Sequence, residues 1–171
     1  MRLLKPFARR RPRGLTLIEV MIGLAITVVL MSLALPSMLG TLQRQRLKSA
    51  AEGLAMDISE ARFEAARRGI PIELGFATGT DWCWSTATRT GCDCHVRQSC
   101  QLKSVRAAEM PSVELVDAQG ALFMPDNAAR TTGGTALLQT PGGDRLRVEL
   151  SGMGRARICA PERSIAPYPN C

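Results

Sequence analysis

Four arginines near the C-terminus are the residues best placed to bind a phosphate group. They are Arg145 and Arg147 in the segment 145–150, and Arg155 and Arg157 in the segment 155–159. Alternate side chains of an extended segment share a face, so each pair presents two guanidinium groups together. Their planar, forked donors suit phosphate oxygens, and Gly152 and Gly154 leave backbone room beside them. The alternative, which the residues leave equally open, is a solvated strand face paired with Glu149 or Glu162.

This end of the chain is locally basic, because residues 130–171 hold 6 Lys or Arg against 3 Asp or Glu. Aromatic residues suited to stacking on bases are nearly absent there, apart from Tyr168. A nucleic acid would therefore be held by its backbone or as a duplex rather than by its bases, weakly and with strong salt dependence.

Glu19 is the single ionisable residue in the apolar segment 15–35, which is long enough to span the hydrocarbon core of a membrane. An acid near the centre of such a helix costs about 2.5–3.5 kcal/mol and needs a partner. Cleavage between Gly14 and Leu15 would free an α-amine that could pair with Glu19 in the same or a neighbouring chain. The alternative is that Glu19 lies at the membrane interface and stays hydrated.

The net charge of +7 is concentrated in residues 1–14, which hold six Lys or Arg and no acid. The rest of the chain is nearly neutral, which excludes a uniformly basic nucleic-acid binder. A basic leader before an apolar span stays in the cytoplasm, so we expect residues after about Leu35 to lie on the other side of the membrane.

The chain has six cysteines, all after the predicted span: Cys83, Cys92, Cys94, Cys100, Cys159 and Cys171. Thiols outside the cytoplasm are normally oxidised, so up to three disulfides are expected, with a pairing that sequence does not fix. Cys159 with Cys171 is favoured because it would close a loop rich in proline. Zinc at Cys92, Cys94, His95 and Cys100 is the alternative, but the irregular spacing argues against a metal site.

No arrangement of residues indicates catalysis. One histidine is present, and no hydrolase, metalloprotease or P-loop motif accompanies it. Three acids with helical spacing are Asp57, Glu60 and Glu64. Because Arg67 and Arg68 follow in the next turn, we interpret them as a solvated helix face with ion pairs. Trp82 and Trp84 are either a ligand platform or, as we prefer, packing residues. We expect neither an enzyme nor a cofactor.

The residues that would position these groups begin with one long helix, from about residue 16 to 68, bent at Pro36. Its continuation over residues 36–69 is amphipathic. The apolar stripe comprises Leu47, Ala51, Leu54, Ile58, Ala61 and Ala65. Arg67, Arg68 and Gly69, followed by Pro71, are typical of a helix end.

Short apolar runs separated by Gly, Pro, Asp and Asn follow the helix and predict strands. They are 70–76, 112–117, 120–125, 135–140, 145–150 and 155–159. The clearest pair is a hairpin around residues 141–144. We therefore expect an α+β fold, in which a long N-terminal helix packs on one antiparallel sheet formed by residues 70–171, with a cysteine-rich insertion and an arginine-rich C-terminal hairpin.

The N-terminus resembles the class III signal of type IV pilins and type II secretion pseudopilins. The resemblance rests on the basic leader, Gly14, the run Thr16-Leu-Ile-Glu19 and the apolar helix interrupted by Pro36. It implies that prepilin peptidase removes residues 1–14 and methylates the amine of Leu15, where the family usually has phenylalanine. It further implies that Glu19 pairs with a neighbouring subunit's amine as subunits from the inner membrane assemble into a filament, with residues 70–171 in the periplasm.

The C-terminal half resembles the GspH/FimT subgroup of these proteins. The resemblance rests on the run Phe123-Met-Pro-Asp126, the hairpin, and Gly154-Arg155-Ala156-Arg157. The last run matches a G-R-x-R element through which FimT-like minor pilins are implicated in binding DNA during natural transformation. The alternative implied by the same resemblance is a type II secretion protein H, a pseudopilin that acts structurally in protein secretion.

Overall fold

The computed structural model describes residues 14, 16–96, 100–126 and 134–171, with the backbone alone for residues 33–37. The chain divides into two compact units, Met1–Leu39 and Gly40–Cys171. A helix, α1 (Leu17–Arg68), contributes to both units, and strands belong to the second. The expected α+β class, a long N-terminal helix followed by antiparallel strands, is confirmed.

Helix α1 begins and ends with local signals in the sequence. The hydroxyl Oγ1 of Thr16 accepts a hydrogen bond from the backbone N–H of Glu19 at 3.4 Å, as an N-cap residue does. At the other end Gly69 takes a left-handed conformation, with φ of 65°, and its N–H donates to the carbonyl oxygen of Ala65. The whole of the predicted stripe from Leu47 to Ala65 is buried.

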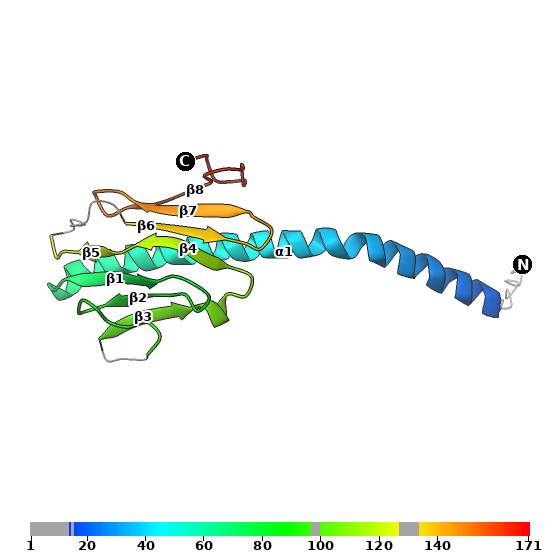
Figure 1. Cartoon of the computed structure of the whole chain (residues 1–171), viewed down its shortest axis with the longest axis horizontal. Coiled ribbons are helices and arrows are strands. Elements are labelled where there is room, and N and C mark those ends of the chain that lie inside the picture. The colour runs from blue at the N-terminus through cyan, green and yellow to red at the C-terminus, as the bar shows by residue number, and fades with distance from the viewer. Residues whose placement is uncertain (1–13, 15, 97–99, 127–133) are drawn as a thin grey trace, which may run out of the picture. The chain divides into compact units, whose positions relative to one another are not determined.

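Two antiparallel sheets pack on the second half of α1 (Figure 1). The first has the order β3-β2-β1-β5, and these strands are β1 (Ile72–Ala77), β2 (Cys83–Ala87), β3 (Gln101–Arg106) and β5 (Ala121–Phe123). A short 3-10 helix, η1 (Ala107–Glu109), follows β3. The second has the order β4-β6-β7-β8, and these strands are β4 (Glu114–Gln119), β6 (Thr135–Gln139), β7 (Arg145–Leu150) and β8 (Ala156–Cys159). One hydrophobic core takes residues from the helix and from both sheets.

The structure corrects the expectation of a single sheet with a cysteine-rich insertion. The insertion itself contributes β2 and β3. These two strands pair with each other, and β2 also pairs with β1. Every residue of β2 is buried, so its sequence, CWSTA, lacks the alternation that marks a half-buried strand. This is the physical reason that the sequence pattern missed it.

Large apolar side chains between Leu17 and Leu39 are exposed wherever the structure describes them. In the described residues, no helix has an apolar stretch of the length and hydropathy that crossing a membrane requires. The span over residues 15–35 stays a prediction.

Candidate nucleic-acid interface

Strands β7 and β8 bring the four predicted arginines to one edge of the second sheet. The register places Glu149 opposite Arg157 and Arg147 opposite Cys159, so these side chains share a face. Leu146, Val148 and Leu150 form the buried face of β7, as their alternation predicted. Arg155 and Arg157 are exposed, whereas Arg145 and Arg147 are half-buried.

The four arginines differ in their partners. Arg145 donates from Nη1 to Glu162 Oε1 at 2.5 Å and from Nε to Gln139 Oε1 at 2.7 Å. Arg147 Nη1 lies 3.9 Å from Glu149 Oε1. The structure shows no side-chain hydrogen bond or ion pair between Arg155 or Arg157 and any residue that it describes. The two alternatives predicted for these arginines therefore apply to different residues. Arg145 and Arg147 on β7 lie near carboxylates, whereas Arg155 and Arg157, just before and on β8, have no such partner among the described residues.

The backbone room predicted beside the two glycines differs between them. Gly152 has open space where a side chain would begin, but the same position at Gly154 faces the side chain of Arg62 on α1. A carbon added to Gly154 would lie 3.2 Å from Arg62 Cδ. Arg62 carries no motif in the sequence, so pattern analysis did not identify it.

All six cysteines form disulfides in the structure. The pairs are Cys83–Cys94, Cys92–Cys100 and Cys159–Cys171. The last is the pairing favoured from the sequence. In the candidate zinc cluster, Cys92 and Cys100 are bonded to each other, and Cys94 is bonded to Cys83. The Nδ1 atom of His95 lies 3.5 Å from Asp81 Oδ2 and 3.5 Å from Cys83 Sγ.

The loop closed by Cys159 and Cys171 is attached to α1 by polar contacts. Tyr168 donates its hydroxyl hydrogen to Glu52, and Lys48 donates to the carbonyl oxygen of Ala166. Burial, together with the hydrogen bond to Glu52, raises the pKa of Tyr168 to about 12.

The acids with helical spacing do not all lie on a solvated face. Asp57 is only 2% exposed, which contradicts the prediction for this residue. Its Oδ2 accepts a hydrogen bond from Trp84 Nε1 at 2.8 Å, and its Oδ1 accepts one from Lys103. This hydrogen bond raises the pKa of Lys103 above its usual range.

Glu64, by contrast, has the predicted ion pairs. Its Oε2 lies 2.8 Å from Arg67 Nη2 and 2.5 Å from Arg68 Nε. Hydrogen bonds from Arg67 and then Arg68 lower the pKa of Glu64 to about 2. Both arginines at the end of α1 thus pair with Glu64, whose single negative charge compensates one of their two positive charges.

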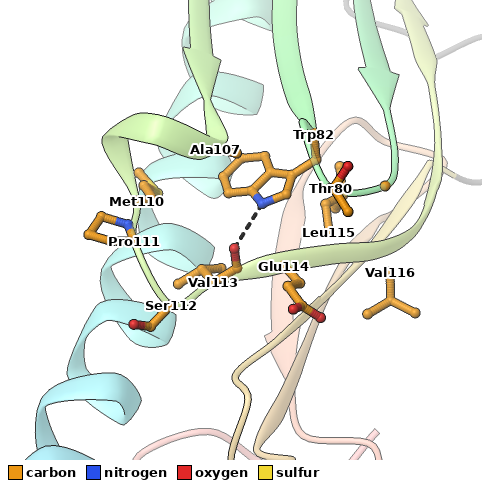
Figure 2. A pocket seen from close by; sticks show the side chains of 11 residues that line it. Thr80, Trp82, Ala107, Met110, Pro111, Ser112, Val113, Glu114, Leu115 and Val116 are labelled. Carbon is orange, nitrogen blue, oxygen red and sulfur yellow. Dashed lines mark hydrogen bonds between the residues drawn. The ribbon is translucent and has the colours of Figure 1, made fainter.

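Trp82 and Trp84 are packing residues, as preferred from the sequence. Each is 1% exposed, and their rings stack with centroids 5.3 Å apart. Trp82 forms part of the wall of a pocket of about 510 Å³ between η1 and β4 (Figure 2). Its indole N–H is already bonded to the carbonyl oxygen of Val113 at 2.8 Å, so this donor is not free to orient a ligand.

The predicted processing and assembly residues lie at the start of the chain. Gly14 is exposed, and Leu15 lies outside the described residues. Glu19 is exposed in the first turn of α1. The structure gives its carboxylate no ion pair with a described residue, so the pairing of Glu19 with a processed N-terminus stays a prediction.

Comparison with known proteins identifies two regions. The prokaryotic N-terminal methylation motif matches residues 9–35, and the family of type II transport protein GspH matches residues 50–154. No protein of curated function matches the chain.

Two crystal structures of the type IV minor pilin FimU of Pseudomonas aeruginosa strain PAO1 have a similar fold. The structure in space group P65 is 18% identical, covers 67% of this chain and 97% of its own, and has a TM-score of 0.53. The structure in space group P21 is 19% identical, covers 70% of this chain and 95% of its own, and has a TM-score of 0.56. At these identities the likeness is one of fold.

Proposed function

The chain belongs to the family of type II transport protein GspH, and from this premise we propose that it is a minor filament subunit that binds the backbone of double-stranded DNA. It has the fold of a type IV minor pilin and the N-terminal methylation motif. The family's role is structural, and the proposed activity is binding for DNA uptake in natural transformation.

Assembly depends on the N-terminus in this proposal. Prepilin peptidase cleaves after Gly14, the segment 15–35 anchors the precursor in the inner membrane, and residues 70–171 lie in the periplasm. The exposed apolar side chains from Leu17 to Leu39 support this, because such a surface must be covered by lipid or by neighbouring helices. Glu19, the one acid there, pairs with the amine of processed Leu15 in an adjacent subunit.

Glu19→Ala tests this assembly step. We expect the precursor to reach the membrane and to be cleaved normally, while the subunit is lost from sheared filaments detected by immunoblot. Normal incorporation of the variant would show that the pairing argument is wrong, and a mature protein beginning at a residue other than Leu15 would show that the cleavage site is wrong.

The observation that carries DNA binding is the exposure of Arg155 and Arg157 without a partner among the described residues. Two neighbouring guanidinium groups repel each other, and a bound phosphate would offset this repulsion by forming charge-assisted hydrogen bonds with them. Each phosphate contact releases counterions, so affinity falls steeply with salt, with a slope of about −0.9 in log K against log salt for each contact. Arg145 and Arg147 add to the positive potential but already have carboxylates nearby.

A gel-shift titration of residues 40–171 with a DNA duplex, repeated over a range of salt, tests the proposal. This fragment is a compact unit that contains the entire core. Arg155→Gln with Arg157→Gln should lower affinity strongly and make the salt slope less negative by about 2. The matched control is Arg44→Gln with Arg46→Gln, which removes the same charge elsewhere. Equal effects of the two double variants would refute the assignment of the site to Arg155 and Arg157, and the absence of any salt-sensitive binding would refute DNA binding.

The second candidate is a pseudopilin of a type II secretion filament, in which Arg155 and Arg157 contact a neighbouring subunit or cargo. The matched family, type II transport protein GspH, favours it. Deletion of the protein separates the two functions: loss of transformability supports the DNA receptor, and loss of protein export with normal transformation supports the secretion subunit.

A further inference from the structure

Hydrogen bonds among its own residues close the turn that precedes β8. The N–H of Ser151 donates to the carbonyl oxygen of Arg155 at 2.9 Å, and the N–H of Gly154 donates to that of Ser151 at 2.8 Å. The Ser151 hydroxyl also accepts a hydrogen bond from the Arg155 N–H at 3.1 Å. Gly154 is buried in this turn and takes a left-handed φ of 73°, a conformation that favours glycine.

Arg62 fills the space that a side chain at Gly154 would need. A carbon added to Gly154 would lie 3.2 Å from Cδ and 3.5 Å from Nε of Arg62. The absence of a side chain at Gly154 thus allows the alkyl stem and the inner guanidinium nitrogen of Arg62 to lie against the turn. Since Arg155 is the next residue, the helix brings a further cation beside the G-R-x-R element.

Arg62 is unlike the other arginines of α1 that the structure places in ion pairs. Arg44 is paired with Asp144, and Arg67 and Arg68 are paired with Glu64. For Arg62 the structure gives no hydrogen bond or ion pair to any residue within the described ranges. Glu149, which lies opposite Arg157, has its carboxylate near Arg147 instead. Arg62, Arg155 and Arg157 thus share the same lack of a described anionic partner.

We propose that Arg62, seated against Gly154, is a third phosphate-binding cation of the DNA surface formed by Arg155 and Arg157. The inference rests on the proposed DNA-binding function and assigns this helix residue to the same site. It gives Gly154 a defined role as well: the glycine keeps the turn tight and leaves room for the Arg62 side chain. Two elements far apart in sequence, α1 and the β7–β8 turn, then contact one polyanion.

Salt-dependent gel-shift titration of residues 40–171 measures the contribution of Arg62. We expect Arg62→Gln to weaken duplex binding about tenfold at about 0.1 M salt and to make the salt slope less negative by about 1, whereas Arg62→Lys retains most of the slope. Arg44→Gln is the matched control, since it removes one positive charge roughly 27 Å away along the same helix. Thermal unfolding of each variant is measured in parallel.

A double-mutant cycle tests the seating of Arg62 against Gly154. Gly154→Ala should weaken binding several-fold in the parent chain and less in the Arg62→Gln background, because the displaced guanidinium is then already missing. Independent effects of the two changes would overturn the seating argument.

The outcomes separate this inference from the proposed function. Binding and salt slope that are unchanged by Arg62→Gln, but lost with Arg155→Gln and Arg157→Gln, would overturn the role of Arg62 and leave DNA binding intact. Equal losses for Arg62→Lys and Arg62→Gln would also overturn it, because charge would not be the property that matters. If replacing all three arginines by glutamine left binding unchanged, the proposed DNA-binding surface itself would be refuted.

Discussion

Removing the carboxylate of Asp57 should destabilise the Gly40–Cys171 unit far more than removing an exposed acid from the same helix. Asp57→Ala leaves the indole N–H of buried Trp84 without its acceptor, which costs about 1–3 kcal/mol. It also removes the hydrogen bond from Lys103, whose side chain is 49% exposed, so we add only about 0.5–1 kcal/mol. The expected loss of unfolding free energy is about 1.5–4 kcal/mol, a large part of the stability of a small domain.

Urea unfolding followed by tryptophan fluorescence is the assay, because the two tryptophans of the chain stack on each other beside Asp57. Asp57→Asn should lie between the parent and Asp57→Ala, since an amide oxygen can still accept from Trp84. Glu60→Ala is the matched control, an exposed acid one turn away, with an expected change within about 0.5 kcal/mol. If Asp57→Ala costs no more than Glu60→Ala, the buried network does not stabilise the fold as argued.

The Lys103 contact adds a dependence on pH to the same experiment. The pKa of Lys103 is raised above its ordinary value of 10.5 by the hydrogen bond to Asp57, so the folded chain favours the charged amine. The stabilisation is therefore complete below about pH 10.5 and is lost as the pH rises through the folded pKa. Asp57→Asn should remove this alkaline component of the stability profile.

Three further results are expected. Tyr168 is the only tyrosine, so the ultraviolet absorbance of its phenolate should titrate near pH 12 in the folded chain and at lower pH in Glu52→Gln. The contribution of this raised pKa to folding stability is complete below about pH 10 and is lost as the pH rises towards 12. An unchanged titration in Glu52→Gln would refute the contact. Replacing Cys159 and Cys171 by alanine should cost about 3 kcal/mol in urea unfolding, and an unchanged midpoint would contradict this. Gly120→Ala should lower stability by about 1–3 kcal/mol, because its new carbon would lie 2.8 Å from a backbone carbonyl oxygen of β1; calorimetry showing an unchanged melting temperature would oppose it.

Local periodicity predicted the parts of the fold that have one buried face. The stripe from Leu47 to Ala65 identified α1 because every member faces the sheets, and the alternation of Leu146, Val148 and Leu150 identified β7. The Cys159–Cys171 disulfide could also be predicted, because these two cysteines flank a single loop.

Residues whose role depends on partners distant in sequence could not be identified from local periodicity. Asp57 has the same helical spacing as Glu60 and Glu64, but Trp84 and Lys103 reach it from strands in the cysteine-rich segment and bury it. Periodicity did not identify the fully buried β2, so the partners of Asp57 were not identified either. Arg62 was missed for the same reason, because its contact with Gly154 exists only once the β7–β8 turn packs on the helix.

The three disulfides join cysteines only 11, 8 and 12 residues apart in sequence. Helix α1 contains no cysteine, so no covalent cross-link holds it to either sheet. A mechanical load transmitted along the helix is therefore resisted by side-chain packing and polar contacts alone. Under tension the helix would detach from the sheets before any covalent bond broke. The disulfides would only limit how far the remaining chain could extend.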